Sequence, residues 1–220
     1  MIIISIGIQC TNAKYQERHN LKTYTYPFDW MFSHPKFIFE MLELLLDKNM
    51  DIRELVEQHF FICQKTVNPG ASENYFTANN MEGKCLYNSK YDVLFPHDVI
   101  ATETIDKYIR RFERLKDVIL KSEEELIFMY TSQSSLRTGN FTIDNRQIIH
   151  DVYSYIVKIY DLISKYRQSQ DKFKFIVFDS IKKDNPALFD GRKITLCLLD
   201  KQKFWLYLLQ QMDTYKDLFV

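Results

Sequence analysis

The 220-residue sequence is poor in the residues that interrupt regular structure, with only five glycines and five prolines. This composition excludes collagen-like and low-complexity chains, and the lack of any internal repeat excludes solenoids. Neither a GxGxxG pattern nor a P-loop occurs, so the glycine-rich loops that bind phosphates in nucleotide enzymes are missing. We therefore expect no nucleotide and no other cofactor.

The sequence also lacks an excess of charge of either sign, because 29 Lys and Arg balance 29 Asp and Glu. Nucleic acids and anionic membranes attract basic proteins, so neither is an expected partner. The best apolar run, FIFEMLELLL, is shorter than the roughly 18 residues of a membrane-crossing helix and contains two glutamates. The apolar N-terminal run lacks a basic region before it, which favours a strand over a secretion signal.

Metal-binding and disulfide patterns are missing as well. The four cysteines are scattered without a CxxC pair, at positions Cys10, Cys63, Cys85 and Cys197. The five histidines form no i,i+4 pair and no HExxH motif, so no zinc site is expected. The spacing of the cysteines is typical of reduced thiols, which predicts a cytoplasmic protein.

Hydrophobic residues, in contrast, make up 46% of the chain and aromatic residues 15%. We expect one α/β domain over residues 1–220 with a large aromatic core, since single cores grow to about 250 residues. Buried strands are predicted where short apolar runs end in small or polar residues, at residues 2–7, 126–131, 173–179 and 194–200.

Helical periodicity separates these runs. The pattern predicts helices over residues 104–120, 145–166 and 201–212, each with one apolar stripe. Strands that alternate with helices favour a mostly parallel central sheet flanked by helices, in a Rossmann-like three-layer arrangement. Arg110, Arg111 and Arg114 are interpreted as the solvated face of the first of these helices.

A helical and irregular insertion is expected after the first strand. Residues 37–61 have the pattern of two helices broken near 48–51, whereas residues 66–90 contain turn signals and weak periodicity. Residues 37–90 together are a candidate lid.

In open parallel sheets, ligands bind outside the carboxyl ends of the strands. The segment after the first strand contains Ser5, Gly7, Gln9 and Cys10, with Gly7 permitting a tight turn. Cys10 would fall at or near the start of a helix, where the helix dipole favours a thiolate. Cys10 alone fits equally well a small buried residue that packs the helix.

Two further segments contain side chains suited to a site. The segment YPFDW places Phe28, Asp29 and Trp30 around a proline-fixed turn, although Trp30 also fits a core position. The segment FPHD sets His97 beside Asp98. Neighbours in an extended segment point apart, so Asp98 need not orient His97.

In this order, SIGxxC, YPFDW, FPHD and the basic-aromatic IRRFERL before a strand resemble the putative papain-like cysteine peptidase family. That family comprises uncharacterised domains of bacteria and large DNA viruses, so a viral member would act in the host cytoplasm. The resemblance covers roughly residues 3–131.

The resemblance implies a hydrolase of the thiol protease type, in which Cys10 is the nucleophile and His97 the general base. Asp98 and Asp29 are the candidates for orienting the imidazole. Ser5, Gly7, Gln9, Phe28 and Trp30 are expected to contact a peptide, acyl or glycan substrate. The sequence does not define the substrate or the oligomeric state.

Two alternatives stay open. A cysteine after a strand of a parallel sheet departs from the papain pattern and resembles SGNH-type hydrolases, but no DxxH motif lies near the C-terminus and no histidine follows His150. In a non-catalytic carbohydrate- or protein-binding module, Phe28, Asp29, Trp30 and His97 would line a recognition pocket.

Overall fold

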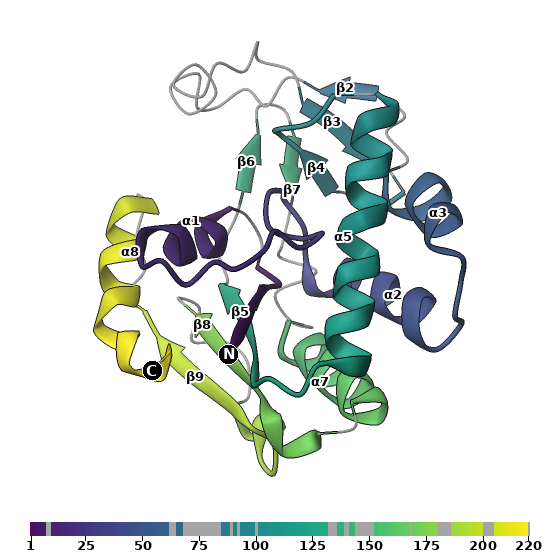
Figure 1. The fold of residues 1–220 in the computed structure, drawn as a ribbon. Helices are drawn as coiled ribbons and strands as arrows, with labels where there is room; N and C mark the ends of the chain where they lie inside the picture. The colour runs from purple at the N-terminus through teal and green to yellow at the C-terminus, as the bar shows by residue number, and fades with distance from the viewer. Residues whose placement is uncertain are drawn as a thin grey trace.

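The computed structural model places a four-stranded parallel sheet between two layers of helices (Figure 1). It describes residues 1–7, 10–61, 65–67, 85–88, 90–91, 93–99, 101–131, 136–138, 141–143, 152–167, 169–179, 186–199 and 205–219. The expected α/β class with three layers is confirmed. None of the helices within these ranges is long and apolar enough to cross a bilayer.

The central sheet has the strand order β1-β5-β8-β9, and every neighbouring pair is parallel. Its strands are β1 (Ile2–Ser5), β5 (Leu126–Thr131), β8 (Phe173–Asp179) and β9 (Ile194–Leu198). The predicted bounds of β5 and β8 are confirmed, while β1 and β9 each end two residues early. β1 pairs with β5 from Ile2 opposite Leu126 to Ser5 opposite Met129.

Alternate side chains of each strand enter different cores, as a pleated strand requires. Ile4, Phe128 and Phe175 pack on one face of the sheet, whereas Ile3, Ile127 and Ile176 pack on the other. Both faces are therefore buried, which explains why these strands are continuous apolar runs rather than alternating ones.

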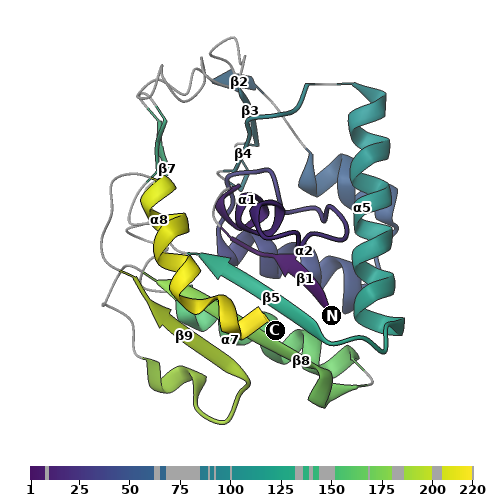
Figure 2. The ribbon, with the colours of Figure 1, turned by 60° about the vertical axis from the view of Figure 1, so that its left-hand side comes forward.

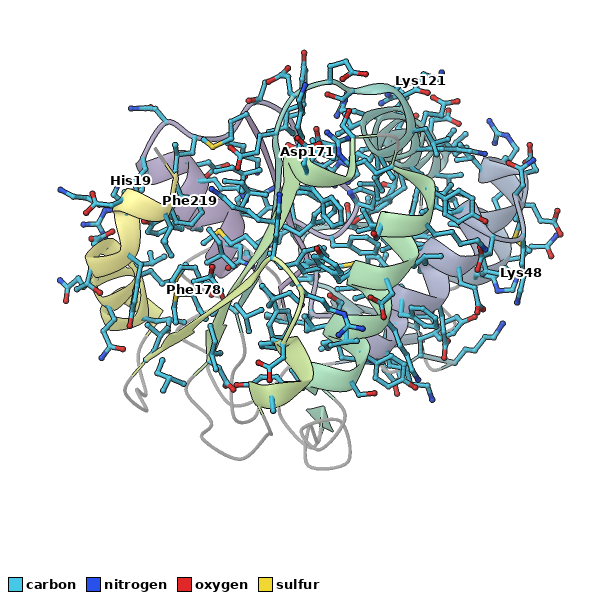
Figure 3. The ribbon with its side chains drawn as sticks, turned by 90° about the horizontal axis from the view of Figure 1, so that it is seen from below. His19, Lys48, Lys121, Asp171, Phe178 and Phe219 are labelled. Carbon is cyan, nitrogen blue, oxygen red and sulfur yellow. The ribbon has the colours of Figure 1, made fainter. Side chains whose placement is uncertain are left out.

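The helices divide between the two faces, as Figure 2 shows. The first face is covered by α2 (Pro35–Leu46), α5 (Thr102–Lys121) and α7 (Val152–Tyr166). The second is covered by α1 (Thr11–Arg18), α8 (Trp205–Met212) and the 3-10 segment η4 (Asp213–Phe219). Figure 3 views the layers from below. Phe178 and Phe219 lie on the side of the second face, and Lys48 lies at the opposite edge of the molecule, beside the helices of the first face.

The predicted helices after the first strand are confirmed with a break between them. α2 begins after His34, whose Nδ1 accepts a hydrogen bond from the backbone N–H of Phe37. α3 (Ile52–Leu55) begins after Asp51, which accepts from the N–H of Glu54, and a π-helical turn, η1 (Val56–Phe60), continues it. Two further 3-10 turns are η2 (Gln170–Lys172) and η3 (Pro186–Phe189).

The interpretation of residues 66–90 as irregular is wrong for part of that segment. β2 (Lys65–Val67), β3 (Cys85–Asn88) and β4 (Val93–Phe95) form a small antiparallel sheet, and residues 68–84 lie outside the described ranges. Another antiparallel pair joins β6 (Leu136–Thr138) to β7 (Phe141–Ile143). Short strands of three or four residues leave too little periodicity to detect.

The helices at residues 104–120, 145–166 and 201–212 correspond to α5, α7 and α8. α5 buries Tyr108, Phe112, Leu115 and Ile119, four members of the expected stripe. The first residues predicted for these last two helices, 145–151 and 201–204, lie outside the described ranges. The solvated-face interpretation is wrong for Arg114, which donates a 2.8 Å hydrogen bond to the carbonyl oxygen of Thr25.

Candidate functional site

The turn after β1 brings the first strand against the start of α1. Gly7 is buried, and a Cβ atom there would lie 2.4 Å from Nδ2 of Asn12, closer than side chains can approach. Glycine is therefore required at position 7 by the proximity of Asn12. The Gly7 carbonyl oxygen accepts a 3.1 Å hydrogen bond from Ser33 Oγ, which ties the turn to the loop before α2.

Asn12 fixes the start of α1 to the carboxyl end of β5. Its Nδ2 donates a 2.7 Å hydrogen bond to the Met129 carbonyl oxygen, and its Oδ1 accepts from the Thr131 hydroxyl. Both side chains are buried. Because buried amide and hydroxyl groups are costly without partners, these contacts hold the helix start in one position. Sequence reasoning gave Asn12 no role, although it lies two residues after Cys10.

Cys10 occupies the position immediately before α1, as expected. Its carbonyl oxygen accepts a 2.9 Å hydrogen bond from the Lys14 N–H, closing the first helical turn. The side chain is partly exposed and carries a thiol rather than a disulfide. It is therefore not the fully buried packing residue of the alternative interpretation.

The side chain of Lys14 extends from α1 to the indole of Trp30. Lys14 lies one helical turn after Cys10, as the hydrogen bond from its N–H to the Cys10 carbonyl oxygen shows. The Lys14 ammonium lies 4.9 Å from the centre of the Trp30 ring, and the Lys22 ammonium lies 4.5 Å from it. Distances below about 6 Å are those of cation–π contacts.

Asp29 is buried next to Lys22, with 1% of its surface exposed. One of its oxygens lies 3.3 Å from the Lys22 ammonium and accepts a 3.0 Å hydrogen bond from the Tyr26 N–H. Burial raises the pKa of Asp29 above 3.8, and the charge of Lys22 opposes this shift. Its closest charged partner is therefore Lys22.

His97 follows β4 in a turn rather than in the extended segment that the sequence suggested. Its ring meets the Trp30 ring edge-on, with centres 5.7 Å apart. Although part of the residue is exposed, neighbouring atoms displace enough water to lower the pKa of His97 below 6.5. Asp98 opposes the shift, whereas the charges of Lys14 and Lys107 add to it.

Asp98 is held by α5. Its side chain is 2% exposed, forms an ion pair with Lys107 and accepts a 2.6 Å hydrogen bond from the Tyr108 hydroxyl. Within the described part of the chain, neither Asp98 nor Asp29 forms a hydrogen bond with His97. Both predicted carboxylates are instead neutralised by lysines.

Two of the other residues predicted to contact the substrate, Phe28 and Ser5, are fully buried. Phe28 is fully buried, with its ring against Phe37, Phe60 and Phe112, so it supports the YPFDW turn from the core. Ser5 is also fully buried, and Gln9 lies outside the described ranges.

The structure thus brings Lys14, Trp30 and His97 together near the start of α1. Lys14 was missed by sequence reasoning, although its spacing of four residues from Cys10 was a usable signal. Among the described residues, no group of three or more His, Cys, Asp or Glu side chains could hold a metal ion.

Comparison with known proteins identifies a family for this chain. No curated protein and no solved structure matches this chain. The family model described as "Putative papain-like cysteine peptidase (DUF1796)" matches residues 1–158, which include β1, Cys10, Trp30 and His97. Because that match spans well over half of the 220 residues, the chain belongs to this family.

Proposed function

We propose that the protein is a thiol-dependent hydrolase or acyl-transfer enzyme in which Cys10 is the nucleophile and His97 the general base. The observation that carries the proposal is that the first turn of α1, which begins at Cys10, contacts the ring beside His97. The Lys14 N–H donates a hydrogen bond to the Cys10 carbonyl oxygen, the Lys14 ammonium lies over Trp30, and the Trp30 ring contacts His97. Membership in the family agrees with this assignment.

The environment of each group suits its proposed role. The start of α1 presents unpaired backbone N–H groups and the positive end of the helix dipole, which favour a thiolate at Cys10. The lowered pKa of His97 leaves its ring mostly neutral at pH 7, so the ring can accept a proton. Hydrogen bonds of such couples are often loose without substrate and shorten when substrate binds.

The reaction would proceed through an acyl-enzyme. His97 takes the proton of Cys10, and the thiolate forms a bond to the carbonyl carbon of the substrate. N–H groups at the helix start stabilise the oxyanion. The tetrahedral intermediate expels its leaving group, which receives the proton from His97. Water, deprotonated by His97, then hydrolyses the thioester and restores the Cys10 thiol.

Asp29 and Asp98 act as positioning residues in this proposal. Asp29 holds Lys22, which lies against Trp30, and Trp30 contacts His97. Asp98 holds the backbone after His97 against α5 through Lys107 and Tyr108. Trp30 and the turn at Gly7 remain proposed contacts of the substrate.

The proposal is tested by alkylating Cys10 with iodoacetamide across a range of pH, in a protein whose other three cysteines are replaced. We expect reaction below pH 7, slowed by about tenfold or more at pH 6.5 in His97→Ala, because an unassisted thiol has a pKa near 8.5. The matched control is His59→Ala, since burial also lowers the pKa of His59. An ordinary thiol that does not respond to His97→Ala contradicts the proposal.

A binding module is the second candidate function. It is favoured by one observation, namely that lysines neutralise both carboxylates that could have oriented His97. In that case Trp30 and His97 would recognise a glycan or protein without reacting. The alkylation experiment separates the two, since in a binding module the ionisation of Cys10 does not depend on His97.

A further inference from the structure

Three lysines surround the Trp30 and His97 rings, and they differ in what they can bind. Lys22 is 10% exposed and pairs with buried Asp29. Lys107 is 33% exposed but pairs with Asp98, whose side chain is 2% exposed. Lys14, in contrast, is 46% exposed and pairs with an acid that is itself exposed. Of these three, Lys14 is therefore the most exposed cation and the one without a buried counter-ion.

The ion pair of Lys14 is weak enough to be replaced. Its partner is Glu17, whose carboxylate lies 3.6 Å away, is itself 43% exposed, and lies equally far from Lys22. Exposed pairs with such geometry contribute little, because water solvates both charges. A carboxylate that entered the site would meet an ammonium whose remaining N–H groups can donate to it.

Trp30 restricts where the Lys14 ammonium lies. The ammonium sits over the ring at 4.9 Å from its centre, and the indole in turn meets His97 edge-on. Lys14 closes the first turn of α1 on Cys10, because its N–H donates a 2.9 Å hydrogen bond to the Cys10 carbonyl oxygen. An anion bound to Lys14 would therefore lie beside the helical turn that begins at Cys10.

We propose that the site accepts substrates with a carboxylate next to the bond that Cys10 attacks, and that Lys14 binds this carboxylate. The inference rests on the proposed function, because it assigns a substrate class to the same site. It makes Lys14 the residue that determines specificity, with Trp30 holding its ammonium in place.

The test compares two reagents that differ in charge but alkylate the same thiolate. Iodoacetate carries a carboxylate and iodoacetamide a neutral amide in its place. The ratio of their rate constants with Cys10, in protein without the other three cysteines, cancels the fraction of thiolate. Measured at pH 9.5, where an ordinary thiol is already ionised, the ratio also does not depend on His97.

We expect Lys14→Met to lower the ratio of iodoacetate to iodoacetamide by about threefold, the effect of one unit charge about 6 Å away in water. Lys14→Arg keeps the charge and should keep the ratio, whereas Glu17→Gln should raise it. The matched control is Lys36→Met, which removes another exposed helical lysine paired with an acid in its own helix, Glu40.

An unchanged ratio in Lys14→Met, or an equal fall in Lys36→Met, overturns the assignment of Lys14. This outcome is distinct from failure of the proposed function, which appears as an iodoacetamide profile that does not respond to His97→Ala. A ratio that depends on Lys14, in a protein whose Cys10 ionises as an ordinary thiol whether or not His97 is present, supports the binding of a carboxylate by Lys14 and excludes only the hydrolase.

Discussion

The core on the face of the central sheet under α2, α5 and α7 contains a larger share of aromatic side chains than the core under α1 and α8, where Tyr15, Phe178 and Phe219 lie among aliphatic and methionine side chains. Phe60, for example, packs against Phe37, Tyr108 and Phe112 with ring centres 4.7 to 5.6 Å apart. α1 is instead attached by polar contacts, through Asn12 at one end and a 2.7 Å pair between His19 and Asp213 at the other.

This difference suggests that one face contributes most to the free energy of folding, whereas the contacts on the other face fix the position of α1. Aromatic packing contributes free energy in proportion to buried area but tolerates small shifts, whereas hydrogen bonds to fixed carbonyl groups define where a helix begins. α1 carries Cys10, so the polar attachment lies where position matters most. Four substitution series test this difference between the two faces.

The largest effect is expected at the aromatic face. Phe60→Ala should lower the free energy of unfolding by about 3–5 kcal/mol, because it leaves a cavity among rings that surround it on several sides. Chemical denaturation measures this loss. Phe178→Ala, whose ring partners are Tyr215 and Phe219 on the opposite face, should cost less. Equal losses would contradict the comparison.

The buried pair under Trp30 should show the next largest effect. Asp29→Asn should lower the free energy of unfolding by about 3 kcal/mol, since it leaves the Lys22 ammonium without its buried counter-ion. Adding Lys22→Met should restore part of the loss. A double mutant that is as unstable as the sum of the single mutants would show that the two groups do not interact.

At the start of α1, Gly7→Ala should cost about 2 kcal/mol because its Cβ would clash with the Asn12 amide. Asn12→Ala should cost a similar amount, because it removes the acceptor of the Thr131 hydroxyl and one of the two donors to the Met129 carbonyl, which keeps the Ile6 N–H. In the double mutant the clash disappears, so the combined loss should be smaller than the sum. Strict additivity would show that Asn12 does not determine the glycine.

The smallest effect concerns pH. The lowered pKa of His97 means that the unfolded chain binds a proton more readily than the native protein below pH 6.5. Stability contributed by neutral His97 is therefore present above pH 6.5 and falls as the pH decreases through this value. We expect His97→Gln to reduce the loss of stability between pH 7 and 5.5.

The measurement is a series of denaturant melts against pH, with His59→Gln as a second variant, because burial lowers the pKa of His59 as well. Identical pH dependence in His97→Gln and the wild type would indicate that His97 is as solvated in the native protein as in the unfolded chain.

Much of the scaffold followed from local patterns. The bounds of β5 and β8 were predictable because continuous apolar runs end at Thr131 and Asp179, and the position of Cys10 before a helix followed from the first strand. The small antiparallel sheet was not predictable, since strands of three or four residues have too few alternations to distinguish them from turns.

The site was less predictable, because its contacts join distant segments. A carboxylate beside a histidine suggested that Asp98 orients His97, but Lys107 and Tyr108 hold this acid once α5 packs against β4. Gly7 was expected to permit a tight turn. The structure shows instead that a Cβ atom at this position would meet Asn12 at the start of α1 and Thr131 at the end of β5. Such pairings depend on packing that no local pattern encodes.

The pairing of Ile2 with Leu126 also has a consequence for protein synthesis. The strand that precedes Cys10 leaves the ribosome about 120 residues before its partner strand. At 5–20 residues per second, translation would keep β1 without its partner for several seconds. The proposed nucleophile is therefore assembled late, so a nascent chain would carry no formed site until β5 has emerged.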